Sequence, residues 1–294
     1  MDDSLLALTL GLGRILLYAG FVMVAGTLYF WVRVWPQGPS NPYLRRTAKI
    51  GAVLLAVLTV ALPLLDWLTS DGAALSDVVS RESGASALVR LALLALFAAS
   101  FTWLTAEAVV GRRSQVALVF VLALSATLVA QSNAIEGSFV ALKVVATLGH
   151  LLATAAWLGG LVALATVIIP RENVTELDRL IPSFSKVAFI SVIVLVVTGS
   201  VHAITVAGGV GELVGSDYGL WLGIKVAVFA LMLVMGNYGR KYVQQVVFRR
   251  MDAQQVQQSS TVQMLAVVMG AELAIAGAVL AMTAALVAVA PPSA

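Results

Sequence analysis

The chain of 294 residues contains no cysteine and only two histidines, and charged side chains make up just 11% of it. Without cysteine it can form neither a disulfide nor a thiolate metal site. The scarcity of charge, together with 60% apolar residues and a mean hydropathy of +0.97, lies outside the range of soluble domains. This composition indicates a membrane protein that is surrounded by lipid and has no nucleic-acid partner.

Apolar stretches long enough to cross roughly 30 Å of hydrocarbon as helices recur along the chain. The eight predicted spans are 5–33, 49–69, 86–110, 115–131, 139–169, 184–207, 219–240 and 262–289. We therefore predict an all-α, polytopic membrane fold with eight transmembrane helices. The longest connection, 241–261, leaves no room for a nucleotide-binding domain, so ATP-driven pumps are excluded and enzymatic activity is not expected.

The basic residues divide the connections into two sets. Of the 18 Lys and Arg residues, thirteen lie in four alternate connections, whereas the opposite loops hold Arg81 alone, with Arg90 and Lys143 at helix edges. The thirteen are Arg33, Arg45, Arg46, Lys49, Arg112, Arg113, Arg171, Arg179, Lys186, Arg240, Lys241, Arg249 and Arg250. Because short, positively charged loops are poorly translocated, the opposite loops and both termini should face outward.

The two halves of the chain look like distant copies of one another. The stretch "GRILLYAGFVMVAGTLYFWVRVWP" (13–36) aligns with "GHLLATAAWLGGLVALATVIIP" (149–170). We predict a parallel repeat of two four-helix membrane halves, 1–138 and 139–294, related by an axis along the membrane normal. The first stretch has no histidine, so a histidine site is expected in the second half alone.

The first histidine lies inside a span, where lipid is expected. The residues that share its helical face are Lys143, Thr147, His150, Thr154 and Trp157. An ionisable residue in a span is a functional hypothesis, because burying a charged one costs at least roughly 2.5 kcal/mol on insertion scales. His150 is therefore the first candidate site residue.

The second histidine, His202, has a similar setting in the next span, on one helical face with Ser191, Thr198 and Thr205. Because the two helices run in opposite directions, both imidazoles should come to similar depth in the outer leaflet and lie close together. Two facing imidazoles can ligate a transition metal, hold a haem iron axially, relay protons or hydrogen-bond the helices together. The alternative is that neighbouring threonine or carbonyl groups simply satisfy both rings.

Two further charges lie within the last two predicted spans. Lys225 can snorkel to the outer surface or pair with Asp66 or Asp217, and its charge would oppose a metal ion bound nearby. Glu272 can pair with Arg14 for stability or take part in an ion path.

Soft and small side chains complete the candidate site. Methionines of the last two spans offer thioethers suited to Cu(I), although each is more often an ordinary core or lipid-facing residue. They are Met232, Met235, Met264, Met269 and Met282. Gly159, Gly160 and Gly199 would let the fifth and sixth predicted helices approach closely, and Trp157 would form a wall two turns below His150.

Three stretches resemble the copper resistance protein D (CopD) family of bacterial and archaeal inner-membrane proteins. They are "HLLATAAWLGGLVAL" (150–164), "FSKVAFISVIVLVVTGSVHA" (184–203) and "YGLWLGIKVAVFALMLVMGNYGR" (218–240). Residues that match the family's motif positions are His150, Trp157, Gly159, Gly160, Phe184, Ser185, Thr198, Gly199, Tyr218, Gly219, Lys225, Asn237 and Arg240. The eight predicted spans agree with the architecture of that family.

The resemblance implies copper ion transport across the cytoplasmic (inner) membrane, usually inward. It also implies an extracytoplasmic copper carrier, which here would be a separate protein, because the chain has no fused copper-binding domain and no Met-rich or His-rich loop. In this hypothesis His150 and His202 bind the ion in the outer leaflet, and binding weakens as the pH falls because a ligating imidazole must be deprotonated. Auxiliary residues of the ion path would be Met232, Met235, Met269, Met282 and Glu272. The gating or structural residues would be Trp157, Gly159, Gly160, Thr198 and Lys225.

Two alternatives accompany this hypothesis. The same two histidines can hold one b-type haem in a membrane electron carrier, which would colour the purified protein. The chain can also be a helper subunit without transport of its own, whose copper phenotype disappears when its partner is absent.

Overall fold

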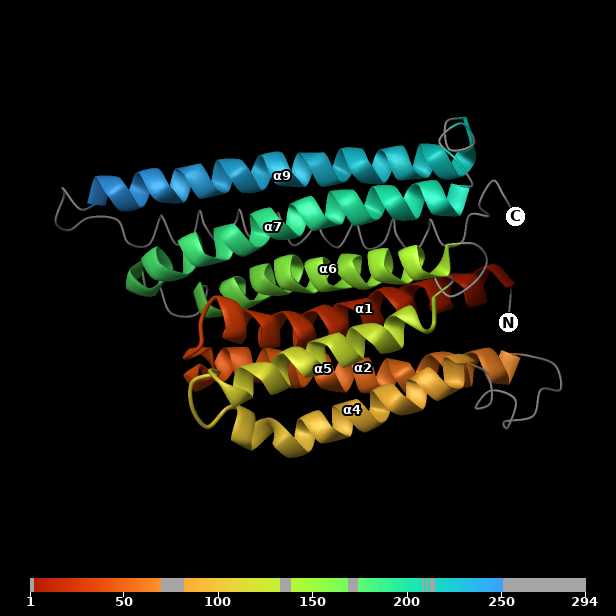
Figure 1. Cartoon of the computed structure of the whole chain (residues 1–294), viewed down its shortest axis with the longest axis horizontal. Helices are drawn as coiled ribbons and strands as arrows, with labels where there is room; N and C mark the ends of the chain where they lie inside the picture. Colours follow the sequence, from red (N-terminus) through yellow and green to blue (C-terminus); the bar gives the residue numbers. More distant parts are fainter. Residues whose placement is uncertain are drawn as a thin grey trace.

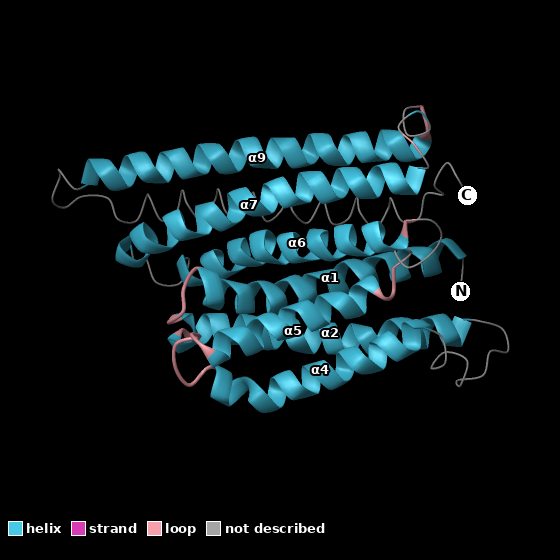
Figure 2. Cartoon of the chain, in the orientation of Figure 1, coloured by secondary structure: helices cyan, strands magenta, loops and turns pink. Residues whose placement is uncertain are grey.

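The computed structural model describes residues 3–69, 82–132, 139–168, 174–207 and 215–250, with residues 209 and 211. All regular structure in these ranges is helical, as Figure 2 shows. The elements are α1 (Asp3–Arg33), η1 (Gly38–Ser40), α2 (Pro42–Thr69), α4 (Glu82–Leu104), α5 (Arg112–Val129), α6 (Val140–Ile168), α7 (Val174–Ala207) and α9 (Asp217–Arg250). The helices lie side by side, and consecutive helices run in opposite directions (Figure 1).

Seven of the eight predicted spans coincide with helices. Among the described residues, six helices, α1, α2, α4, α5, α6 and α7, are long and apolar enough to cross a membrane, and α9 contains a shorter apolar segment, Gly219–Val234. The prediction of a polytopic, all-α membrane protein is therefore confirmed. The eighth span, 262–289, lies outside the described residues, so the count of eight and the placement of the termini stay predictions.

The third predicted span is shorter than its apolar sequence suggested. The sequence predicts a helix to residue 110, but α4 ends at Leu104 and a loop leads to Gly111, which has a positive φ of 53°. Val109 in this loop is only 1% exposed, and its N–H donates to the carbonyl of Pro36 at 2.8 Å. The loop is apolar because it closes one end of the bundle, not because it continues the span.

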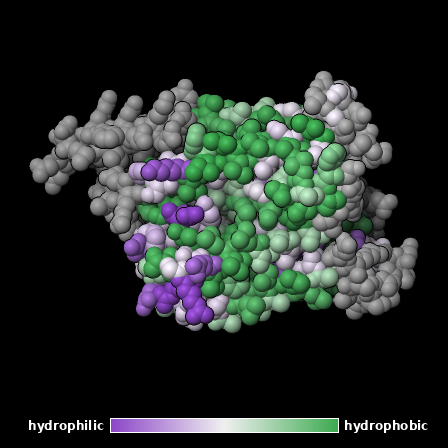
Figure 3. All heavy atoms as spheres, viewed as in Figure 1, coloured by the Kyte–Doolittle hydropathy of each residue, from purple (hydrophilic) through white to green (hydrophobic). Residues whose placement is uncertain are grey.

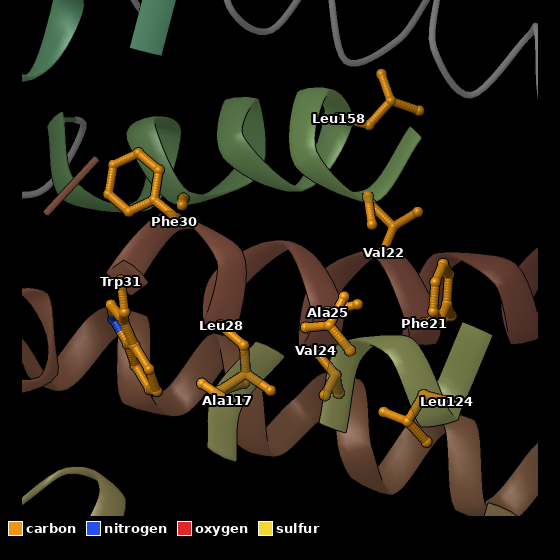
Figure 4. Packing of buried hydrophobic residues seen from close by; sticks show 14 of the residues in the cluster. Phe21, Val22, Val24, Ala25, Leu28, Phe30, Trp31, Ala117, Leu124 and Leu158 are labelled. Carbon is orange, nitrogen blue, oxygen red and sulfur yellow. The ribbon is translucent and has the colours of Figure 1, made fainter. Parts of the chain in front are cut away.

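The helix α1 lies at the centre of the bundle and packs against α2, α5 and α6. Its side chains Phe21, Val24, Leu28 and Trp31 are completely buried, and Figure 4 shows them among residues of the neighbouring helices. The helix α7 packs on the other side of α6, and α9 contacts α7. This order places α6 and α7, which carry the two histidines, between α1 and α9.

Basic residues gather at one end of the bundle. The C-terminal end of α1 and the N-terminal ends of α2 and α5 meet there, and this end is the most hydrophilic part of the face drawn in Figure 3. The cations at this basic end are Arg33, Arg45, Arg46, Lys49, Arg112 and Arg113. Six of the thirteen basic residues that the sequence assigned to one side thus lie at one end of the bundle, and the side of the membrane that this end faces stays a prediction.

Candidate functional site

The first histidine is fixed by a hydrogen bond between two helices. His150 Nδ1 of α6 lies 3.1 Å from Thr198 Oγ1 of α7. The single hydroxyl hydrogen of Thr198 is donated to the carbonyl of Val194 at 2.6 Å, so its oxygen accepts a hydrogen from Nδ1. A neutral imidazole that carries its hydrogen on Nδ1 keeps a lone pair on Nε2. In the described part of the chain Nε2 has no hydrogen-bond partner, so it can serve as a ligand.

Glycines allow the two helices to meet at this bond. A Cβ atom added at Gly149 would lie 3.2 Å from Thr198 Cγ2, and one added at Gly199 would lie 3.6 Å from His150 Cε1. Farther along, a Cβ at Gly160 would collide with the ring of Phe184 in α7. Gly160 therefore lies where α6 and α7 approach closely, as its predicted role requires, whereas a Cβ atom at Gly199 would make only an ordinary van der Waals contact.

Gly159 faces a different helix from the one predicted. A Cβ atom added there would collide with Gly26 Cα of α1 and would lie 2.6 Å from the carbonyl oxygen of Val22. A Cβ atom added at Gly26 would likewise collide with Gly159 Cα, and it would lie 2.6 Å from the carbonyl oxygen of Ala155. The two glycines form the crossing point of α1 and α6, so Gly159 positions the helix of His150 against the first helix.

The second histidine is half-buried, and one of its ring nitrogens is unpaired. Among the described residues, the buried atom His202 Nδ1 has no hydrogen-bond partner, and the same is true of Thr147 Oγ1, one turn before His150 on α6. Thr198, not His202, lies directly across from His150, so His202 is one helical turn, about 6 Å, farther along α7. Leaving a buried polar atom unpaired costs roughly 1–3 kcal/mol. The two atoms therefore mark a place where an additional polar group or ion would be stabilised.

The other threonines of the two polar faces bond within their own helices. Thr154 Oγ1 donates to the carbonyl of His150 at 2.7 Å, and Thr205 Oγ1 donates to the carbonyl of Val201 at 2.9 Å. Their hydrogens are thus not available to the imidazoles, and Thr198 alone among these residues links a histidine to the neighbouring helix.

A third helix brings a positive charge to the two histidines. His150 interacts electrostatically with His202 and with Lys225 of α9, and His202 interacts with Lys225 and Lys143. Lys225 makes no ion pair with Asp66 or Asp217 in the ranges the structure describes. We call Thr147, His150, Thr198, His202 and Lys225 the histidine cluster; it combines two imidazoles, two hydroxyl groups and one ammonium group.

The remaining candidates take different places. Trp157 packs edge to face against Phe229 of α9, with ring centroids 5.4 Å apart, which seats α9 against α6. Met232 is 2% exposed within the apolar core. The side chain of Met235 and the residues Met264, Met269, Glu272 and Met282 lie outside the described part of the chain.

A metal ion bound in the histidine cluster would draw on few strong protein ligands. Within the described ranges, no group of three or more His, Cys, Asp or Glu side chains could hold a metal ion together. Among His, Cys, Asp and Glu side chains of the described residues, an ion bound there would therefore have at most the two imidazoles as ligands.

Sequence reasoning missed a buried cation in the first half of the chain. Arg90, expected at a helix edge, is 1% exposed; its Nε donates to Thr127 Oγ1 at 2.9 Å and its Nη2 to the Thr127 carbonyl at 2.9 Å. Nη2 also donates to Gln131 Oε1 at 2.6 Å, and Nη1 lies 3.5 Å from Thr59 Oγ1. The signal for this site was the spacing of Thr127 and Gln131, one helical turn apart in an apolar span.

Comparisons with known proteins relate the chain to copper. Residues 178–286 match the family model described as copper resistance protein D. The chain is also 27% identical over 248 residues to a copper resistance protein D of Pseudomonas syringae pv. tomato, which covers 77% of this chain and 79% of that relative. No solved structure matches the chain. The resemblance to the copper resistance protein D family, first based on three sequence stretches, is therefore confirmed.

Proposed function

We propose, from the relation to the copper resistance protein D family, that this protein carries copper ions across the cytoplasmic membrane through the histidine cluster. The inward direction follows the expectation for that family. The donor would be a separate extracytoplasmic carrier protein, since the sequence shows no copper-capturing loop of its own. Copper is here the cargo, and the imidazoles of His150 and His202 are its first protein ligands.

The observation that carries this proposal is the hydrogen bond between His150 and Thr198. Metal-binding histidines usually donate their second ring N–H to an oxygen, which fixes the tautomer and the orientation of the ring. Thr198 supplies that oxygen and leaves Nε2 of His150 free to bind a metal. Imidazole nitrogen is a suitable ligand for copper. The unpaired Nδ1 of His202 adds a second imidazole from the opposite helix.

The proposal is tested by measuring cell-associated copper in cells that express His150→Ala or His202→Ala at the level of the unchanged protein. We expect both variants to abolish the copper accumulation that depends on the protein. Thr166→Ala is a matched control, because Thr166 lies on the same helix and its hydroxyl donates to the Ala163 carbonyl of that helix at 2.9 Å. Unchanged accumulation in both histidine variants would overturn the proposal.

The haem hypothesis uses the same two histidines and is tested with the same variants. A b-type haem held between two imidazoles gives the purified protein strong visible absorption after expression with ample haem. A colourless protein that binds copper, and loses it on His150→Ala, supports the transport site. Visible absorption that His150→Ala and His202→Ala each remove would instead assign the cluster to haem.

A further inference from the structure

A second polar feature lies at the basic end, far from the histidine cluster along the bundle. The end of α4, the loop after it and the start of α5 line a shallow, open surface pocket of about 340 Å³. Its lining residues are Trp103, Glu107, Ala108, Val110, Arg112 and Arg113. The proposed transport function uses none of these residues.

Two arginines line this pocket, and an aromatic ring holds one of them in place. Arg113 pairs with Glu107 at 2.5 Å, and its guanidinium lies 5.5 Å from the centroid of the Trp103 ring. Arg112 is exposed and makes no ion pair within the described residues. One carboxylate therefore faces two guanidinium groups, and the pocket keeps a net positive charge.

The neighbouring helix α2 adds two more cations. Lys49 Nζ lies 5.1 Å from the centroid of the Phe101 ring of α4, and the guanidinium carbon of Arg45 lies 6.0 Å from it. Such cation–π contacts stabilise a cation at a ring face within about 6 Å. The end of α4 is thus flanked by basic side chains from both α2 and α5.

Apolar side chains continue from the pocket along the surface of the bundle. Trp103 is 41% and Val110 59% exposed at the pocket itself. Farther from the basic end, Leu96 of α4 and Val119 of α5 are 59% and 62% exposed. A ligand that combines an anionic head with long apolar chains would match both the charge of the pocket and the surface beside it.

We propose that this pocket binds the headgroup of an anionic phospholipid, with the phosphate at Arg112 and Arg113 and the acyl chains along α4 and α5. Basic pockets between membrane helices are suited to anionic headgroups, and each cation near the surface adds roughly 1 kcal/mol, or about fivefold in affinity. Glu107 competes with the headgroup for Arg113. Release of Glu107 from Arg113 is therefore part of binding.

Retention of lipid by the purified full-length protein tests the proposal. The protein is exposed in detergent to phosphatidylglycerol, to phosphatidylcholine with the same acyl chains, or to inorganic phosphate, and bound molecules are counted by native mass spectrometry. We expect preferential retention of phosphatidylglycerol. The double variant Arg112→Gln, Arg113→Gln should lower its affinity about thirtyfold, following the estimate of about fivefold per cation. Glu107→Gln should raise it severalfold, because Arg113 then loses its competitor.

The matched control is the double variant Arg33→Gln, Arg46→Gln, which removes the same charge from the same end without touching the pocket lining. If this control lowers lipid retention as much as the pocket variant does, the basic end attracts lipid generally and the proposed site is wrong. Lower retention in Glu107→Gln, or inorganic phosphate bound as well as the lipid, would also overturn it.

Discussion

His150 donates its Nδ1 hydrogen to Thr198 Oγ1 across the interface of α6 and α7, over 3.1 Å. The direction of this bond follows from the single hydrogen of Thr198, which is already donated to the carbonyl of Val194. The bond therefore fixes both the tautomer of the imidazole and the register of the two helices. The free Nε2 atom, on which the proposed copper site depends, is a direct consequence.

Thr198→Val tests this relationship, because valine keeps the shape of threonine and removes the oxygen. The Nδ1 hydrogen then loses its acceptor, and the ring can change tautomer or rotate. We expect copper affinity to fall about 10- to 100-fold, as is typical when the partner of a metal-binding histidine is removed. Copper titration of the purified protein measures the change.

Thr198→Ser is the control for that experiment, since serine keeps the hydroxyl group. It should restore most of the affinity that Thr198→Val loses. If valine and serine at this position bind copper equally well, the hydrogen bond does not position a ligand.

Lys225→Gln removes the positive charge that acts on both histidines. Unit charges about 10 Å apart at an effective dielectric constant of about 20 repel each other by roughly 1–2 kcal/mol, so copper affinity should rise about tenfold. Lys225→Arg retains the charge and should leave the affinity near its original value. A lower affinity in Lys225→Gln would show that the ammonium group supports the site instead of opposing the ion.

The positions of the helices could be predicted well from hydropathy, because each described span is a nearly unbroken apolar run. The C-terminal end of α4 could not be predicted from hydropathy. Val109 is apolar and buried like a span residue, but it packs at the end of the bundle and bonds to the carbonyl of Pro36. Hydropathy records burial and does not distinguish burial in a loop from burial in a helix.

The candidate site was predictable in part for a similar reason. Helical periodicity placed His150 and Thr198 on polar faces of adjacent antiparallel helices, and the structure brings these two residues into contact. Periodicity along one helix cannot identify the partner helix, which explains why Gly159 faces α1 and not α7. Nor could it show that Arg90, near the start of an apolar run, is buried among neutral oxygens.

Two glycine substitutions should differ in their effect on stability, because Gly159 lies at the crossing of α1 and α6 and Gly223 faces open space. Gly159→Ala places a methyl group against Gly26 and should lower the free energy of unfolding by about 1–3 kcal/mol, as overpacking does. Gly223→Ala in α9 meets no atom within 4 Å and should be neutral or stabilising by about 0.5–1 kcal/mol. Thermal denaturation in detergent compares the two. Equal stability of both variants would show that α1 and α6 do not approach at Gly26.

The network around Arg90 predicts a fold-stabilising role that depends on the shape of the guanidinium group. Arg90 joins α4 to α5 through Thr127 and Gln131, with Thr59 of α2 nearby. Arg90→Leu removes the hydrogen bonds that Arg90 donates to the Thr127 carbonyl and to the Gln131 amide oxygen, and it should lower the free energy of unfolding by about 1–3 kcal/mol. Arg90→Lys keeps the charge but lacks the planar fork that reaches both groups of Thr127, so it should lose a smaller part of this stability.

Arg33→Leu, at the exposed basic end, is the control and should leave stability within about 0.5 kcal/mol of the unchanged protein. If Arg90→Leu melts at the same temperature as this control, the buried guanidinium does not hold the first half of the bundle together.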